Sequence, residues 1–316
     1  MKKIWLFGTL CLMLMCLCAC MNGNEELTTS EEMTTNEDAS TNKEELWDVK
    51  QYESVEEIKS IEKLDLERIL PEGVEVSTYK VKYQVDVCTV VSYLSVPDAC
   101  IEEQDAYPCI IFNRGGNREF SANKPEDIAY LAESSGKVIF ATQYRGVDGG
   151  TGTEEFGGAD LNDVLKLIDF CEEFAFVDTE QIYMMGISRG GMMTYMAARE
   201  DSRIKKAVVV SGIADCFMSW DEREDMQEVY HDLIGKTPDE APEEYEKRSA
   251  VYWADEIKCP VLIIHSSLDE KVSYAQAEKM TECLEKAGKE YKFVNYDDNI
   301  HGLHPQDFDI IMDWFS

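Results

Sequence analysis

A serine lies between two glycines near the middle of the chain, in the hexapeptide Gly-Ile-Ser-Arg-Gly-Gly at residues 186–191. An apolar run precedes this hexapeptide and a helix-prone run follows it, which predicts a sharp turn from a strand into a helix. In such a turn, side chains at Gly186 and Gly190 would collide with the neighbouring backbone. The turn would present the hydroxyl of Ser188 as a nucleophile at the end of the strand.

A serine hydroxyl is a weak nucleophile at neutral pH, so it needs a base such as an imidazole within hydrogen-bond reach. The sequence contains four histidines, one of them in a polar segment. His301 and His304 follow the last predicted strand, whereas His265 ends an earlier strand and is expected to brace the next loop. We favour His301 as the base because Gly302 follows it, and we expect His304 to begin the final helix.

An imidazole base needs a carboxylate that orients it and stabilises its protonated form. Asp269 follows the apolar strand predicted at 261–264, with room for a loop between them. An isolated loop aspartate is commonly only a turn or helix-cap residue. Here the preceding strand and the order Ser188, Asp269, His301 favour the catalytic role.

The oxyanion that forms during acyl transfer needs preorganised N–H donors. One donor is expected to be the backbone N–H of Arg189, directly after the nucleophile. The second is expected in the loop 113–117, where Gly115 and Gly116 would let the backbone approach a substrate. A glycine turn without a donor role is the alternative for this loop.

Strand and helix patterns alternate over residues 46–316, which predicts one doubly wound α/β domain. Two strands at 79–85 and 87–96 predict an antiparallel edge. Short apolar runs predict a mostly parallel sheet with strands at 109–112, 138–142, 182–185, 207–210, 261–264 and 292–296. Helices are expected at 47–70, 125–135, 161–174, 191–199, 274–287 and 306–314. The carboxyl ends of parallel strands form one edge, where we expect Ser188, Asp269 and the loop 113–117.

A polar, largely helical segment at 213–254 interrupts this alternation. Its position after the strand that follows Ser188 fits a cap over the active site. A solvent-exposed helical segment without contact to substrate is an equal alternative. Asp160 and Asp163 are expected to be solvated or helix-start charges. Three methionines are expected in the core behind the nucleophile: Met192, Met193 and Met196.

The N-terminus predicts export and lipid modification. A basic start and a short apolar run indicate a signal peptide at residues 1–19. The ending Leu-Cys-Ala-Cys resembles the lipobox of bacterial lipoproteins, so Cys20 is the expected lipid anchor. An ordinary secretory signal or an uncleaved anchor is the alternative. Residues 20–45 are acidic and rich in Thr and Ser, which predicts a disordered tether. The expected location is extracytoplasmic, on the bacterial cell membrane.

The composition of the chain argues against two classes of binding partner. The formal net charge of −33 argues against nucleic acid and against attraction to anionic lipid headgroups. Seven cysteines lie beyond the N-terminal region, none in a CxxC motif, so buried thiols are favoured over a disulfide framework, with one bridge as an alternative. We expect no metal site and no cofactor.

The chain resembles the catalytic domain of the prolyl oligopeptidase family. Five segments carry this resemblance: Tyr-Arg-Gly at 144–146, residues 178–191, Lys-Arg-Ser-Ala at 247–250, residues 259–269 and His-Gly at 301–302. The resemblance implies the α/β-hydrolase fold, with Ser188 as nucleophile, His301 as base and Asp269 as the orienting acid.

Three departures from the family pattern bear on function. Ser266 stands where the family commonly has glycine. Arg114 precedes Gly115 where the family often has histidine or tyrosine, which leaves backbone N–H groups or the Arg114 side chain as donors. We also expect no β-propeller ahead of this domain. The predicted function is therefore a serine hydrolase that cleaves carboxylic esters or short acyl-peptides through an acyl-enzyme. A prolyl oligopeptidase-like peptidase, an acyltransferase and a noncatalytic surface-binding lipoprotein are the alternatives.

Overall fold

The computed structural model describes residues 48–66, 69–71 and 73–316. The expected signal peptide at 1–19, the anchor Cys20 and the tether at 20–45 lie outside the described residues. Within the described ranges, none of the helices has the length and the apolar character that crossing a bilayer requires.

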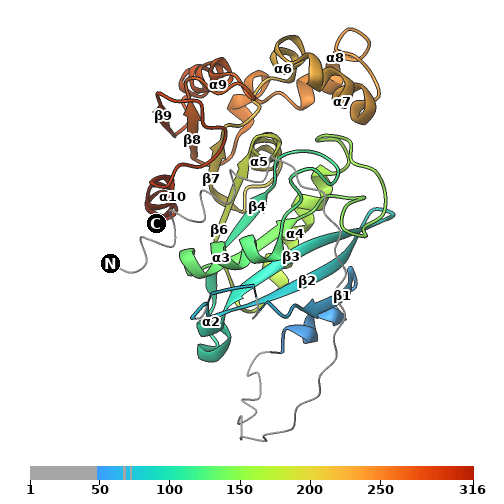
Figure 1. Ribbon diagram of the computed structural model, residues 1–316, viewed down its shortest axis with the longest axis vertical. Coiled ribbons are helices and arrows are strands. Elements are labelled where there is room, and N and C mark those ends of the chain that lie inside the picture. The colour runs from blue at the N-terminus through green and yellow to red at the C-terminus, as the bar shows by residue number, and fades with distance from the viewer. Residues whose placement is uncertain (1–47, 67–68, 72) are drawn as a thin grey trace, which may run out of the picture.

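In the part of the chain that the structure describes, nine strands form one sheet in the order β1-β2-β3-β5-β4-β6-β7-β8-β9. Figure 1 shows the two edges of this sheet, with β9 near the top and β1 near the bottom. The antiparallel edge consists of β1 (Ile58–Lys63), β2 (Val76–Val85) and β3 (Cys88–Pro97). The parallel part consists of β4 (Tyr107–Asn113), β5 (Val138–Thr142), β6 (Val177–Ile187), β7 (Ile204–Val210), β8 (Val261–Ser266) and β9 (Tyr291–Tyr296). The prediction of a mostly parallel sheet with an antiparallel N-terminal edge is confirmed.

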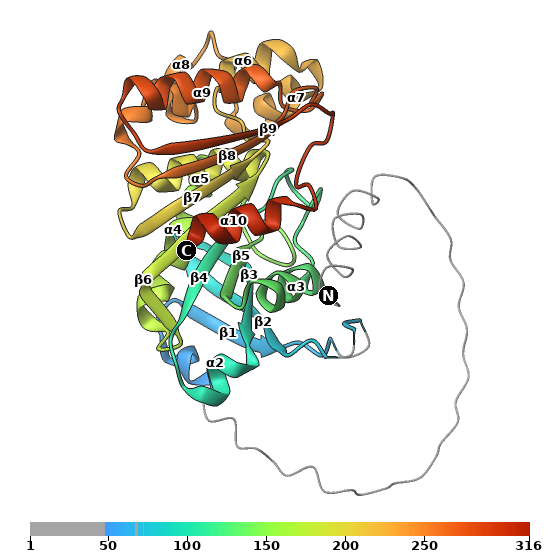
Figure 2. The ribbon, with the colours of Figure 1, turned by 90° about the vertical axis from the view of Figure 1, so that its left-hand side faces the viewer.

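Helices cover both faces of the sheet, as its apolar strands require. Helices α3 (Pro125–Ser135) and α10 (Asp307–Phe315) pack on one face, where Ile128 and Phe315 join a buried cluster with Ile110 and Ile139. Figure 2 shows these two helices in front of the sheet. The other face carries α4 (Leu161–Glu173), α5 (Arg189–Glu200) and α9 (Tyr274–Lys286). A short helix, α2 (Asp98–Glu103), joins β3 to β4.

The helix predicted at 47–70 is wrong. The chain instead forms a 3-10 helix, η1 (Val49–Ser54), and then the edge strand β1. Without β1, the outer edge of β2 would present unpaired backbone N–H and C=O groups. Ile61 pairs with Val81 across this edge, and both side chains are buried. Pairing and burial therefore override the helical pattern of the local sequence.

The sulfur-containing side chains pack as small apolar groups. All seven cysteines in the described ranges are free, and six of them are buried, as predicted. The side chains of Met192, Met193 and Met196 are buried behind Ser188 in the main apolar cluster. The prediction that they form core is confirmed.

Tyr52 attaches the N-terminal 3-10 helix to the domain. Its ring packs edge-on against Phe174 at 4.4 Å between centroids, and its hydroxyl accepts a hydrogen bond from Ala175 N at 3.0 Å. We expect Tyr52→Ala to lower the free energy of unfolding by about 3 kcal/mol through lost packing. Tyr52→Phe keeps the ring, so it should lose only about 1 kcal/mol. Urea unfolding of both variants checks this, and equal losses would contradict the assigned role of the ring.

Candidate active site

Ser188 occupies the turn between β6 and α5. Its φ of 58° and ψ of −122° lie in a region that residues other than glycine rarely adopt. The turn is held from both sides, because Ser188 N donates to Val210 O at 2.9 Å and Gly191 N donates to Ser188 O at 2.9 Å. The surrounding structure thus enforces a strained backbone that raises the hydroxyl at the carboxyl end of β6.

The glycines beside Ser188 are required by crowding. A Cβ atom at Gly186 would lie 2.1 Å from the carbonyl oxygen of Gly190. A Cβ atom at Gly190 would lie 2.0 Å from the carbonyl oxygen of Asn113, at the end of β4. Neither position has room for a side chain, so the two glycines allow both the tight turn and its close approach to β4.

Asp269 and His301 meet in a hydrogen bond. The distance between His301 Nδ1 and Asp269 Oδ2 is 2.8 Å, and the other oxygen of Asp269 accepts from the backbone N–H groups of Lys271 and Val272. Burial raises the pKa of the Asp269 carboxyl, but the His301 hydrogen bond and these N–H groups outweigh burial and hold the pKa below its usual value. An ionised Asp269 leaves Nε2 of His301 as the ring atom that can accept a proton.

The end of β7 lies between Ser188 and His301. Ser188 N binds the carbonyl of Val210, and the N–H of Gly302 donates to the hydroxyl of Ser211 at 3.3 Å. Ser188 and His301 therefore flank one strand end, although no hydrogen bond joins their side chains directly among the described residues. Hydrogen bonds of this kind often tighten only when a substrate is bound.

The other two histidines near this edge have structural partners. His265 is buried, and its Nε2 lies 2.8 Å from Val272 O, so it braces the loop that carries Asp269. His304 lies between two carboxylates, with Nε2 at 3.0 Å from Asp298 and Nδ1 at 3.3 Å from Asp307. His304 thus lies just before α10, and the partners of its two ring nitrogens are carboxylates other than Asp269.

The loop after β4 touches Ser188. A Cβ atom at Gly115 would lie 3.1 Å from Ile187 O and 3.3 Å from the Cβ of Ser188. At Gly116 the φ of 64° is left-handed, and a Cβ there would meet Phe120 O at 2.3 Å. The loop therefore brings its backbone against Ser188.

The side chain of Arg114 does not face this site. Its guanidinium is buried and donates to carbonyl oxygens of its own loop and to Gln143 O, and it pairs with Glu154. These bonds use all five N–H hydrogens of the side chain. The option that the Arg114 side chain binds an oxyanion is therefore contradicted, which leaves the backbone of the loop.

Two carboxylates expected in solvent are buried instead. Asp160 and Asp163 are 0% exposed. Asp160 pairs with Arg189, whose guanidinium also pairs with Glu154, and Asp163 pairs with Arg145 at 2.7 Å. Of the two alternatives for these residues, solvated charges are wrong, because each aspartate pairs with a buried arginine. Helix-start charges are confirmed, since Asp160 is the N-cap residue of α4 and Asp163 lies in its first turn. Glu154 pairs with buried arginines too, but no local sequence pattern distinguishes it among the 63 acidic residues of the chain.

The insert lies over loops at the same edge of the sheet. It contains α6 (Cys216–Glu222), α7 (Glu224–Ile234) and α8 (Pro242–Lys247), which group beside α9 at one end of the molecule (Figure 1). Its contacts with strand-end loops include an ion pair of Asp232 with Arg118 at 2.9 Å, edge-on packing of Tyr230 against Phe156, and a hydrogen bond from Arg223 to Lys271 O. These contacts attach the insert to loops at the strand ends, and its role as a cap over the active site stays a prediction.

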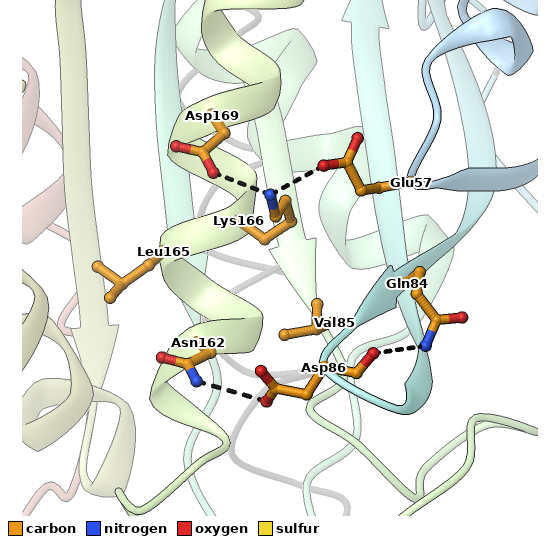
Figure 3. Close-up of a pocket in the computed structure, with 8 residues that line it drawn as sticks. All are labelled: Glu57, Gln84, Val85, Asp86, Asn162, Leu165, Lys166 and Asp169. Atoms are coloured by element: carbon orange, nitrogen blue, oxygen red, sulfur yellow. Dashed lines mark hydrogen bonds and ion pairs between the residues drawn. The ribbon is translucent and has the colours of Figure 1, made fainter.

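A surface pocket lies elsewhere, between α4 and the turn from β2 to β3 (Figure 3). Within it, Lys166 bridges Glu57 and Asp169, and Asp86 accepts a hydrogen bond from Asn162. Its charged groups thus have partners within the pocket, and none of its lining residues belongs to the candidate active site.

Two comparisons of sequence identify relatives. The model of the prolyl oligopeptidase family matches residues 125–315. The uncharacterized peptidase YtmA of Bacillus subtilis (strain 168) is 31% identical over 206 residues, which cover 65% of this chain and 80% of the relative. The uncharacterized peptidase YuxL of the same organism is 25% identical over 265 residues, which cover 75% of this chain but only 38% of the relative.

Solved structures share the fold. The acylaminoacyl peptidase of Pyrococcus horikoshii aligns with a TM-score of 0.67 and 23% identity, over 76% of this chain and 41% of that one. Acetyl xylan esterase 1 from Thermoanaerobacterium sp. JW/SL YS485 aligns with a TM-score of 0.61 and 17% identity, over 81% and 87% respectively. Together with the strand-to-helix turn at Ser188, these matches show that the chain belongs to the prolyl oligopeptidase family and is a serine hydrolase with the α/β-hydrolase fold.

Proposed function

We propose that this protein hydrolyses carboxylic esters or short acylated peptides through an acyl-enzyme on Ser188, with His301 and Asp269 completing a catalytic triad. The observation that carries this proposal is the 2.8 Å hydrogen bond between His301 and Asp269, at the strand edge where the strained turn raises Ser188. The family and the order of the three residues along the chain support it.

In this mechanism, Ser188 Oγ attacks the acyl carbon while Nε2 of His301 takes the hydroxyl proton. The buried carboxylate of Asp269 orients the ring and stabilises its protonated form. The backbone N–H groups of Arg189 and Gly115 bind the oxyanion. His301 then protonates the leaving group, and a water molecule activated by the same ring hydrolyses the acyl-enzyme.

Both esters and short acylated peptides fit the fold, which the chain shares with an acetyl xylan esterase and with an acylaminoacyl peptidase. A peptidase activity is the second candidate, favoured by the relative named a peptidase of which the chain covers 80%. Rates with aryl esters and with aminoacyl amides of the same acyl group distinguish the two.

We expect a fluorophosphonate probe to label the wild-type protein at Ser188 and not to label Ser188→Ala. Removing the nucleophile of a serine hydrolase lowers turnover by about 10⁶-fold, so hydrolysis of a chromogenic ester should fall to background. Mass spectrometry of the labelled peptide and ester assays measure this. Turnover that survives in folded Ser188→Ala would refute the proposed nucleophile. Ligand binding without turnover, equal in both proteins, would support the noncatalytic alternative.

We expect Asp269→Asn to lower kcat by about 10⁴-fold, because an amide favours the wrong tautomer of the imidazole. Steady-state ester kinetics of the folded variant measure this.

The same variant tests the lowered pKa of the Asp269 carboxyl. A carboxyl whose pKa is lower in the fold than its ordinary 3.8 contributes stability above that pH and loses it as pH falls through the folded value. The stability advantage of the wild type over Asp269→Asn should therefore exist at pH 7 and shrink below pH 4. Melting temperatures from pH 7 to pH 3 check this, and a constant difference would contradict it.

We further propose that the enzyme is extracytoplasmic and held on the membrane by lipid on Cys20. A basic start, an apolar run and small residues before Cys20 support this proposal. Wild-type protein expressed in a bacterial host should incorporate an alkyne-labelled fatty acid and enter the detergent phase in a partition assay. Cys20→Ala should do neither, because several acyl chains on one cysteine are what would hold the enzyme firmly. Equal labelling of both proteins would place the modification elsewhere.

A further inference from the structure

Buried arginine side chains lie at both proposed oxyanion donors, one of which is the backbone N–H of Arg189 itself. Arg114 precedes Gly115 and Arg189 follows Ser188, and each guanidinium is 1% exposed. A buried charge is costly unless it is paired and hydrogen-bonded. Glu154 supplies the shared partner, since one carboxylate oxygen lies 2.9 Å from Arg114 Nη2 and the other pairs with Nη1 of Arg189.

Glu154 thus bridges the two arginines. On one side of this bridge, Arg114 organises the loop after β4. Its guanidinium donates to the carbonyl oxygens of Gly115, Arg118 and Phe120, at 3.2, 2.8 and 3.1 Å respectively. Glu154 adds a second tie, because it accepts from Arg118 N at 2.8 Å. The loop therefore folds around one guanidinium and is fastened to one carboxylate.

The Arg189 side of the bridge fixes the first turn of α5. Its guanidinium pairs with Asp160 as well as Glu154, and Nη1 donates to Gly116 O at 3.2 Å. The ring of Tyr144 packs against both arginines, 5.0 Å from the guanidinium of Arg114 and 4.6 Å from that of Arg189. The positive charges of the two arginines are therefore matched by the negative charges of Glu154 and Asp160. Among the described residues, Glu154 is the one carboxylate that touches both arginines.

We propose that Glu154 is a positioning residue for the oxyanion hole. By binding Arg114 with one oxygen and Arg189 with the other, it sets the separation of the backbone N–H groups of Gly115 and Arg189. The inference rests on the proposed function, because it assigns a role to Glu154 only in stabilising the oxyanion of that reaction. Glu154 contacts no reacting atom and acts through the two arginines.

Fixed donors matter for catalysis because the negative charge on the oxyanion is short-lived. An oxyanion exists only in the tetrahedral intermediate and the transition states next to it, so donors help most when they already point at its position. The donor loop contains two adjacent glycines and would otherwise be free to move. Glu154 removes that freedom without using any group that binds substrate.

The test compares Glu154→Gln and Glu154→Asp with the wild type, using an aryl ester and its thiono analogue as substrates. Sulfur is a weak hydrogen-bond acceptor, so the ratio of the two rates reports how much the donors contribute. We expect kcat of Glu154→Gln for the ester to fall about 10- to 100-fold, less than the 10²–10³ typical of losing one donor outright. KM should change little, and the ester-to-thiono rate ratio should fall toward one.

Glu154→Asp keeps the charge but shortens the side chain, so it provides a folded variant even where Glu154→Gln is unstable. We expect it to show a smaller change of the same kind. The matched control is Asp163→Asn, which breaks the equally buried pair with Arg145. Asp163 touches neither arginine of the bridge, so this control should lose stability but keep kcat and the rate ratio of the wild type. Rates are compared per folded protein, measured by near-ultraviolet circular dichroism.

Two results would overturn the inference: an unchanged ester-to-thiono ratio in folded Glu154→Asp, or an equal fall of that ratio in Asp163→Asn. Failure of the proposed function looks different. In that case wild-type protein would show neither ester turnover nor fluorophosphonate labelling of Ser188. A wild-type enzyme that is labelled, together with a Glu154 variant of normal ratio, would reject only the role of Glu154.

Discussion

The close approach of the ends of β4 and β6 is the constraint on which the candidate site depends. A Cβ at Gly190 would lie 2.0 Å from Asn113 O, so only glycine lets α5 begin this near to β4. The side chains strengthen the same contact, because Asn113 Nδ2 donates to the hydroxyl of Thr194 at 3.0 Å. One backbone contact thus raises Ser188 and also brings Gly115 against it, so the proposed nucleophile and the proposed donor loop are positioned together.

The parts of the site that the sequence predicts are those with a local signal. A serine between glycines, after an apolar run, requires a sharp turn whatever the rest of the chain does, and the structure has that turn. The parallel strands were predictable for a similar reason, since short runs of apolar residues bounded by polar loops suit little else. Asp269 and His301 follow such strands, and the rule that parallel strands end at one edge then suffices to place them near each other.

The features that the sequence did not predict depend on partners far away along the chain. Residues 47–70 mix acidic and apolar side chains as a helix would, and only the open edge of β2 makes Ile58–Lys63 a strand. Asp160 has the surroundings of an ordinary helix-start charge, but its partner Arg189 is 29 positions away. Glu154 is 40 positions from Arg114. No local pattern announces pairs of this kind, because burial creates them only after the sheet has formed.

The buried charges beside the proposed oxyanion donors raise the question of why apolar residues do not fill this space. Breaking a buried ion pair is destabilising, yet well-packed apolar side chains of similar volume are often at least as stable, so stability alone does not account for these charges. Apolar packing is non-directional and allows a loop to settle in several positions. Hydrogen bonds require both a distance and an angle, and Arg114 makes them to three carbonyl groups of its own loop. We therefore attribute the network to geometry, because it holds a glycine-rich loop in one conformation beside Ser188. There an error of a fraction of an ångström would weaken the proposed hydrogen bond to the oxyanion.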